Sequence, residues 1–211
     1  MTNNGRNALR EYYNAAAATY VDKMSGGFGG WLRKRELKLT SALIPAEGNN
    51  RNTLDAGCGP CLYSMLLRDR GFNVTAIDIS SEMVAIAKGF EFPAYEMDIE
   101  HSDPPEELLT PFDFILCAGV LEFAEDVENF LSSLRRMVGD DGEVVLVAPL
   151  AGTMGFFYRK YLTKHGIPAR VYTKKSLHIA LISAGFEPIE IRARWPICLA
   201  ARVKAKAISQ I

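Results

Sequence analysis

The hydrophobic residues of the chain fall into two patterns that alternate along its length. Short continuous apolar runs, typical of buried strands, lie at 51–55, 74–78, 93–98, 112–117 and 143–148. Apolar positions three or four residues apart predict helices between these strands. The first helix contains Leu62, Met65, Leu66 and Leu67 and ends at Gly71, and the second is capped by Ser80 or Ser81. The third spans 127–138, and the fourth is capped by Thr173 and runs through Ala184. Asp140-Asp141-Gly142 is expected to turn the chain into the fifth strand.

Strands and helices in this order predict a parallel sheet whose connections are right-handed crossovers. The last two predicted strands, 187–195 and 197–204, meet at Pro196 with no room for a crossover helix. These two strands are therefore expected to pair antiparallel. The pattern predicts an α/β sandwich.

The composition is that of a globular protein and gives no sign of a polyanionic partner. The chain has 211 residues, 48% of them hydrophobic and 23% charged, and its formal net charge is −1. One domain over residues 1–211 is the simplest organisation for this length. The polar start lacks the apolar core of a secretory signal, and no apolar run approaches the ~18 residues of a membrane span. With four cysteines in a chain of this size, a reducing, cytoplasmic setting is expected.

The segment DAGCGPC, which follows the first predicted strand, has two interpretations. Cys58 and Cys61 form a C-x-x-C, typical of a redox couple or half of a zinc site. Asp55, Gly57 and Gly59 form an acid-x-Gly-x-Gly turn, typical of a loop laid against a nucleotide. A structural zinc site needs four ligands, and the other two cysteines and the three histidines form no second ligand pair. The glycines are superfluous for disulfide exchange, so the nucleotide interpretation is favoured.

Three carboxylates stand at the ends of predicted strands, where open α/β sheets bind their ligands. Asp55, Asp78 and Asp98 end the first three strands, although each alone could equally cap a turn or a helix. Asp78 follows the glycine turn by about 20 residues, the distance at which an acid meets a ribose hydroxyl. The chain has neither the third glycine of a dinucleotide loop nor a G-K-[S/T], and Asp55 would repel a phosphate and attract a cation. The ligand that fits is a phosphate-free nucleoside such as S-adenosylmethionine.

In this order the motifs resemble those of the class I S-adenosylmethionine-dependent methyltransferases of the small-molecule type, from about Thr53 to Lys204. TLDAGCGPC is similar to the glycine-rich first motif of that family, and VTAIDISSEMVAIA to the segment that carries the ribose acid. YEMDIE, FDFILCAGVLEF and YTKKSLHIALISAGFEPIEI resemble the adenine segment, the fourth strand and the late helix and strand. The resemblance implies a Rossmann-like, seven-stranded, mostly parallel sheet with an antiparallel last strand and helices on both faces.

The resemblance also implies a cofactor, S-adenosyl-L-methionine, and a set of residues that hold it. Asp55, Gly57, Cys58 and Gly59 would hold the methionine part, and Asp78 would hold the ribose hydroxyls. The adenine would meet Ile79, Met83, Asp98 and Ile99. The set is completed by Cys117 and Leu121 from the fourth strand and by Tyr20. Cys61 stands where many members carry glycine or serine, which leaves its contact with the cofactor open.

Two further segments are expected to enclose the site. Residues 1–45 would form a helical lid, with REYYNAAAATYVDKM as a helix, SGGFGG as a flexible hinge and Trp31 where the helix resumes. Tyr13 and Tyr20 could meet the cofactor, as an aromatic of this region does in similar small-molecule enzymes. Residues 151–172 would form the acceptor wall, with aromatics for an apolar acceptor and basic residues for an anionic group or an anionic membrane surface: Phe156, Phe157, Tyr158, Tyr161, Arg159, Lys160, Lys164 and Arg170. An amphipathic helix packed on the core, with solvated basic residues, is the alternative.

The chemistry dictates no particular catalytic residue, and none is assigned. A sulfonium donor is already activated, so alignment and exclusion of water suffice unless the acceptor must lose a proton. His165 and Glu122 are the candidate bases, with a solvated loop histidine and a helix cap as their respective alternatives. Asp140-Asp141 is assigned to a turn, so no metal site is predicted.

The acceptor is expected to be a small molecule rather than a nucleic acid. CAGV follows the fourth strand where base methylases carry a polar-Pro-Pro-aromatic motif, and the DPPE at 103–106 lies before that strand. Two alternatives remain: a non-catalytic module that binds S-adenosylmethionine, and a nicotinamide-dependent oxidoreductase on a related sheet. The methylated atom (O, N or C) and the oligomeric state are left open.

Overall fold

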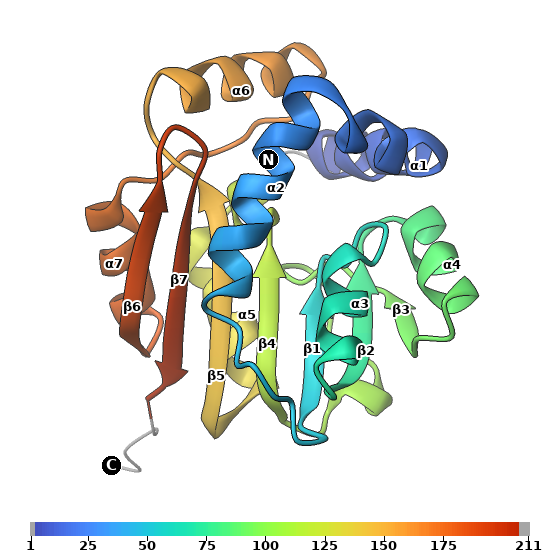
Figure 1. Ribbon diagram of the computed structural model, residues 1–211, viewed down its shortest axis with the longest axis vertical. Coiled ribbons are helices and arrows are strands. Elements are labelled where there is room, and N and C mark those ends of the chain that lie inside the picture. The colour runs from blue at the N-terminus through green and yellow to red at the C-terminus, as the bar shows by residue number, and fades with distance from the viewer. Residues whose placement is uncertain (1–2, 207–211) are drawn as a thin grey trace.

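The computed structural model describes residues 3–206 and contains one seven-stranded sheet (Figure 1). Residues 1, 2 and 207–211, which the single-domain prediction includes, lie outside the described residues. The strands are β1 Asn52–Ala56, β2 Asn73–Asp78, β3 Ala94–Glu96, β4 Phe112–Ala118, β5 Val138–Pro149, β6 Phe186–Arg194 and β7 Cys198–Ala205. Their order across the sheet is β3-β2-β1-β4-β5-β7-β6.

The sheet is parallel from β3 to β5, and β7 is antiparallel to both of its neighbours, β5 and β6. The short connection between β6 and β7 leaves no other pairing, as the sequence predicts. A Rossmann-like, mostly parallel sheet with an antiparallel last strand is therefore confirmed.

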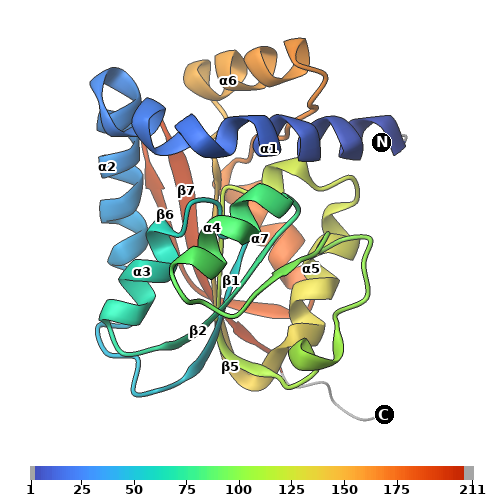
Figure 2. The same ribbon diagram turned by 90° about the vertical axis from the view of Figure 1, so that its right-hand side faces the viewer.

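Helices cover both faces of the sheet (Figures 1 and 2). They are α1 Asn3–Ser25, α2 Gly27–Ser41, α3 Leu62–Asp69, α4 Ser81–Gly89, α5 Val127–Met137, α6 Thr153–Lys164 and α7 Lys174–Ser183. Successive residues of a strand point to opposite faces. In β4, Ile115 and Cys117 lie in the apolar cluster that includes α5 and α7, whereas Phe114 and Leu116 lie in the cluster that includes α3 and α4.

Two helices belong to neither face. In Figure 2, α1 lies across the carboxyl ends of the parallel strands, with α6 above it. A small apolar cluster joins them, with Leu9 of α1, Leu162 of α6 and Phe123 buried in it. The two helices therefore form a roof over the edge of the sheet where ligands bind. Within residues 3–206, no helix combines the length and apolarity that a membrane crossing requires.

The fifth strand begins earlier than predicted, at Val138 rather than Glu143. Phe112 pairs with Val138 and Phe114 with Glu143, so residues 139–142 bulge out of the ladder between β4 and β5. The predicted turn at 140–142 is therefore wrong, and the segment is a bulge within a strand. Gly142 permits this close packing, since an added Cβ would lie 2.5 Å from Val138 Cγ2 and 2.9 Å from Phe112 O.

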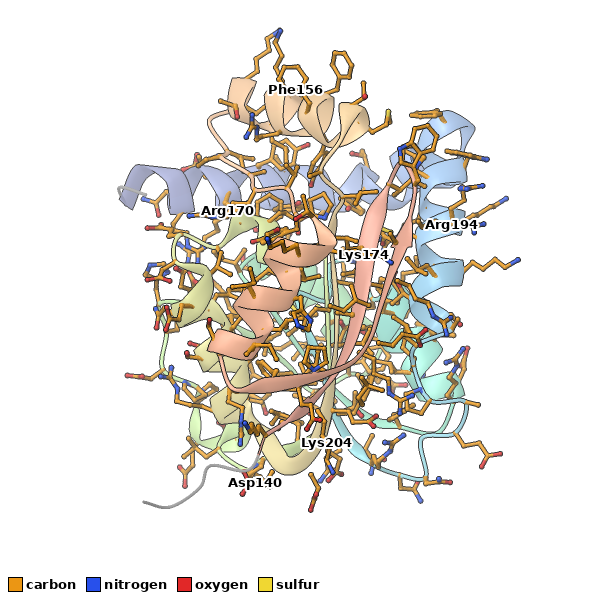
Figure 3. All side chains as sticks on the ribbon, turned by 90° about the vertical axis from the view of Figure 1, so that its left-hand side faces the viewer. Asp140, Phe156, Arg170, Lys174, Arg194 and Lys204 are labelled. Atoms are coloured by element: carbon orange, nitrogen blue, oxygen red, sulfur yellow. The ribbon has the colours of Figure 1, made fainter. Side chains whose placement is uncertain are left out.

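Gly142→Ala is expected to destabilise the fold by about 1–3 kcal/mol, because the new methyl group overlaps Val138 and the Phe112 backbone. Gly89, the last residue of α4, is the matched control, because a Cβ there meets no atom within 4 Å. Gly89→Ala should be neutral or stabilising by up to about 1 kcal/mol. Urea unfolding measures both variants, and equal stabilities would contradict the packing argument. Figure 3 places Asp140 of the bulge at the end of the molecule opposite α6, so the cavity described below is not disturbed.

The junction of the first two helices is also tighter than predicted. The flexible hinge over 25–30 is wrong, since α1 runs to Ser25 and α2 begins at Gly27, with only Gly26 between them. Gly27 has a φ of +57°, a left-handed conformation that glycine adopts readily, and this allows the corner. Gly30 N donates to Gly26 O at 3.0 Å, so the helix has formed before Trp31.

Candidate functional site

A cavity of about 570 Å³ lies under the roof of α1 and α6. The loop after β1, the end of β2 and the turn after β4 contribute to its lining, together with residues of α1, α2 and α6. This is the edge of the sheet at which open α/β folds bind their ligands.

The loop after β1 reaches the cavity through Gly57, Cys58 and Gly59. Gly57 and Gly59 have φ values of +85° and +49°, in the left-handed region that favours glycine. An added Cβ at Gly57 would overlap Val120 Cγ2, whereas one at Gly59 would meet no atom within 4 Å. Gly57 is therefore required by packing against the turn after β4, and Gly59 leaves open space at the cavity.

Cys58 and Cys61 are both buried free thiols. Cys61 caps the start of α3 with a φ of +63°, and its Sγ lies 3.8 Å from Gly59 O. A hydrogen bond between the two thiols raises the pKa of Cys58 and lowers that of Cys61. Cys58 lines the cavity and Cys61 does not. In the described part of the chain, no group of three or more His, Cys, Asp or Glu side chains is arranged to hold a metal ion.

Asp78, at the end of β2, lines the cavity and at the same time holds the glycine loop. Its Oδ2 accepts a hydrogen bond from Gly59 N at 2.9 Å, and its Oδ1 accepts one from Ser80 N, also at 2.9 Å. Burial raises the pKa of this carboxyl, and the backbone N–H groups of Ser80, Gly59 and Ile79 oppose the rise. Each oxygen keeps lone pairs with which to accept a hydrogen bond from a ligand.

Three of the predicted cofactor residues, Asp55, Cys117 and Leu121, lie beneath the cavity. Their side chains are buried and are not among the residues that line it. Asp55 Oδ2 accepts a hydrogen bond from Ser64 Oγ at 2.5 Å, and burial raises the pKa of Asp55 to about 7. These side chains support the floor of the cavity, and the structure does not bring them to its surface.

The predicted adenine-side residues do line the cavity: Ile79, Met83, Asp98 and Ile99. Arg6 of α1, which sequence reasoning missed, also lines it and fixes the Asp98 carboxylate. Arg6 Nη2 donates to Asp98 Oδ1 at 2.7 Å and to Glu100 Oε2 at 3.0 Å. Arg10 Nε donates to Ile79 O at 3.2 Å, and Asn14 Oδ1 accepts a hydrogen bond from Ser80 Oγ at 2.6 Å, so α1 is bonded to this part of the site at several places.

One face of α1 is turned toward the cavity. Most of its residues there recur three or four positions apart, namely Arg6, Leu9, Tyr13, Ala16 and Tyr20, and Tyr12 also lines the cavity. Burial raises the pKa of both tyrosines, so their hydroxyls are neutral donors. This spacing is the sequence signal that could have identified Arg6 alongside the two predicted tyrosines.

Sequence reasoning also missed a polar pair on α2. Arg33 Nη1 donates to Glu36 Oε1 at 2.6 Å, and the Tyr63 hydroxyl donates to the same oxygen at 3.0 Å. The Arg33 guanidinium lies 5.0 Å from the centre of the Tyr63 ring. All three residues line the cavity. No motif marks them, because only the packing of α2 brings them to the site.

The acceptor wall predicted over 151–172 contains α6, and only one face of this helix meets the cavity. That face consists of Met154, Gly155, Tyr158, Tyr161 and Leu162. Phe156 and Phe157 are exposed, and Figure 3 shows Phe156 on α6 at the top of the molecule. A helix with 3.6 residues per turn cannot bring all four predicted aromatics to one side, and only Tyr158 and Tyr161 reach the cavity.

The basic residues of this segment do not enter the cavity. Three of them are exposed on α6: Arg159, Lys160 and Lys164. Arg170 donates to the carbonyl oxygens of Ala124 at 3.0 Å and of Glu125 at 2.7 Å. The arrangement agrees with the alternative of an amphipathic helix whose charges are solvated.

The two candidate bases have different surroundings. His165 is exposed at the C-terminal cap of α6, its ring centroid 4.7 Å from that of Tyr161, and it does not line the cavity. Glu122 lines the cavity from the short helix after β4 and is only 4% exposed. Its Oε1 accepts a hydrogen bond from the Tyr158 hydroxyl at 3.2 Å. Its Oε2 is buried and has no hydrogen-bond partner within residues 3–206.

Burial raises the pKa of Glu122 to about 8. The helix-cap alternative for Glu122 is wrong, because Asp126 caps α5 and accepts hydrogen bonds from Glu128 N and Asn129 N. Of the two candidate bases, only Glu122 faces the cavity.

Comparison with known proteins gives matches of several kinds. The chain matches a family model described as a methyltransferase domain over residues 28–191. The ubiquinone biosynthesis O-methyltransferase of Pseudomonas aeruginosa (strain UCBPP-PA14) is 28% identical over 130 residues, which are 55% of this chain and 56% of that protein. The magnesium protoporphyrin IX methyltransferase from Synechocystis PCC 6803, solved with bound SAH, gives a TM-score of 0.74 at 17% identity, covering 96% of this chain and 100% of that one.

A further solved structure, the 1,6-didemethyltoxoflavin-N1-methyltransferase from Burkholderia thailandensis, contains bound 1,6-didemethyltoxoflavin and S-adenosylhomocysteine. It gives a TM-score of 0.69 at 17% identity and covers 95% of this chain and 88% of that one. The likeness to these two structures establishes the fold. The chain spans about half the length of the curated relatives it matches.

Proposed function

This chain belongs to the family of methyltransferase domains, and we propose that it transfers the methyl group of S-adenosylmethionine to a small-molecule acceptor bound under α1 and α6. One observation carries the proposal: the cavity lies over a glycine loop that is hydrogen-bonded to a strand-end carboxylate, Asp78. Proteins of similar fold have been solved with S-adenosylmethionine or its product bound.

The residues around the cavity fit this cofactor. Gly59 leaves open space beside the backbone, which lets a ligand approach closely. Asp78 would accept hydrogen bonds from the two ribose hydroxyls through its free lone pairs. Ile79 and Met83 would pack against the adenine, and Asp98 would accept a hydrogen bond from its amino group.

The polar pair on α2 suits the amino-acid part of the same molecule. The Arg33 guanidinium would bind the carboxylate, and the Glu36 carboxylate would bind the ammonium group. When bound, S-adenosylmethionine supplies a methyl group on a positively charged sulfur, which requires alignment more than activation. The chain's own residues orient the two reactants and exclude water, since Leu9 and Leu162 close the roof above them.

The proposal includes the organisation of the chain around this site. The helices α1 and α2 act as the lid, and 151–172 acts as the wall of the acceptor site through Tyr158 and Tyr161. A cytoplasmic setting is part of the same proposal, because all four cysteines are free thiols.

Asp78→Ala is expected to weaken the binding of S-adenosylmethionine by about ten- to a hundredfold, because a hydrogen bond to a charged group contributes roughly 1.5–3 kcal/mol. Isothermal titration calorimetry measures this change. Asp78→Asn removes the charge but keeps an oxygen that accepts one backbone N–H. Comparing its affinity with that of Asp78→Ala therefore separates the loss of charge from distortion of the loop.

Asp103→Ala is the matched control, since Asp103 is an exposed carboxylate away from the cavity. It should leave the affinity unchanged. An Asp78→Ala variant that binds S-adenosylmethionine as tightly as the wild type would refute the assignment, and tight binding of NAD instead would favour the oxidoreductase alternative.

A further inference from the structure

We propose that Glu122 binds the methyl acceptor through its Oε2 atom and accepts the proton that the acceptor must lose, so that the acceptor is an apolar or aromatic molecule with an O–H or N–H group. This inference rests on the proposed function and names the chemistry of its second substrate.

A buried oxygen without a hydrogen-bond partner is costly and therefore uncommon in folded proteins. Tyr158 satisfies Oε1, and Oε2 has no partner within the described residues. Glu122 lines the cavity, so a molecule bound there can supply the missing donor. The geometry identifies the donor only as an O–H or N–H group, because these are the groups that a carboxyl oxygen accepts from.

The described groups whose pKa shifts involve Glu122 include no cation. These groups are neutral or acidic and come from several elements around the carboxyl: Tyr13 and Tyr20 of α1, Glu36 of α2, Cys117 of β4, Tyr158 of α6, Tyr172 in the segment before α7, and Cys198 of β7. Arg170 donates its backbone N–H to Glu122 O at 2.8 Å, and its guanidinium donates to the carbonyl oxygens of Ala124 and Glu125. Arg33, the cation on α2, is paired with Glu36. The ionised form of Glu122 is therefore best stabilised by a donor from the acceptor itself.

The surroundings of the carboxyl favour an aromatic acceptor. Tyr13 and Phe123 meet edge to face beside it, with ring centroids 5.9 Å apart. Leu162 closes the cavity above, and these side chains present apolar surface to a bound ring. An anionic acceptor is disfavoured because it would meet a buried carboxyl rather than the basic residues of α6, which lie outside the cavity.

The reaction balances with Glu122 as the base. A lone pair of the acceptor oxygen or nitrogen forms the bond to the methyl carbon, and the bond from that carbon to sulfur breaks with its electron pair going to sulfur. The acceptor's proton passes to Oε2. The positive charge of the sulfonium and the negative charge of the carboxylate both disappear, so the net charge is conserved. Burial raises the pKa of Glu122 to about 8, a value suited to accepting a proton near neutral pH.

Binding of three small probes to the protein saturated with S-adenosylhomocysteine tests this inference without knowledge of the natural acceptor. Phenol presents an O–H, aniline an N–H and toluene neither, and the three have similar size. At pH 9, phenol or aniline should bind the wild type at least about tenfold more tightly than toluene, as expected for a hydrogen bond to a buried charged group. In Glu122→Leu this preference should fall to within about twofold. Preference for phenol alone would indicate a hydroxyl acceptor, and preference for aniline alone an amine.

Glu187→Leu is the matched control, because Glu187 is an exposed carboxylate on β6, and it should keep the preference of the wild type. Glu122→Gln is a second variant in case the leucine variant does not fold, and it should reduce the preference severalfold. The inference is overturned if neither donor probe binds the wild type more tightly than toluene, or if Glu122→Leu keeps the preference. S-adenosylhomocysteine binding is measured first and alone, and its loss in the wild type would overturn the proposed function instead.

Discussion

Glu122→Gln is expected to raise the free energy of unfolding at pH 9 by about 5 kcal/mol while changing it little at pH 4. Burial raises the pKa of Glu122 from 4.5 to about 8. Below pH 4.5 the carboxyl is protonated in both the folded and the unfolded chain, so the stability linked to its protonation is fully present. Between these two values only the unfolded chain releases the proton, and folding becomes less favourable as pH rises. Above pH 8 both states are ionised and the loss levels off.

Glutamine has nearly the shape of a protonated glutamate and stays neutral at every pH, so the variant does not pay this penalty. Urea unfolding of the wild type and the variant at pH 4, 7 and 9 measures the difference. Asp55 and Asp78 also have raised pKa values, but they titrate in both proteins and cancel in the comparison. The exposed Glu187→Gln serves as control and should show a constant difference near zero. If the free energies of unfolding of Glu122→Gln and the wild type changed with pH in parallel, Glu122 would not be desolvated.

The floor of the cavity could be predicted from the sequence because its chemistry is local. Gly57, Gly59 and Asp78 stand next to the ends of strands that the hydrophobic pattern identifies, and parallel strands bring those ends to one edge. No knowledge of distant packing is needed. The sequence does not predict which side chains reach the cavity. Asp55 and Cys117 also lie near strand ends, but they are buried beneath the cavity surface.

The roof could be predicted only in part, because helical spacing shows which residues share a face but not what that face covers. Tyr13 and Tyr20 were identified, whereas Arg6 on the same face and the Arg33–Glu36 pair on α2 were not. Glu122 is buried by α1 and α6, which lie more than 30 residues away along the chain, so its raised pKa has no local signal.

Gly57→Ala is expected to destabilise the fold by about 3–5 kcal/mol, the sum of overpacking and backbone strain. The new Cβ would overlap Val120 Cγ2, and the residue would hold a φ of +85° that side chains other than glycine disfavour. Gly59→Ala, with a φ of +49° and open space around the Cβ, should cost only about 1 kcal/mol. The loop of Gly57→Ala must also shift, so S-adenosylmethionine binding should become undetectable by calorimetry.

The double variant Gly57→Ala/Val120→Ala separates the two causes. Alanine at 120 removes Cγ2, the atom that the new methyl group overlaps, and leaves the strain of φ in place. Urea unfolding of the four proteins in this cycle should therefore give a coupling energy of about 1–3 kcal/mol that favours the double variant. Additive losses would mean that the loop accommodates the methyl group by moving away from Val120. The glycine would then be required by the backbone angle alone, and contact with the turn after β4 would not hold the loop in position.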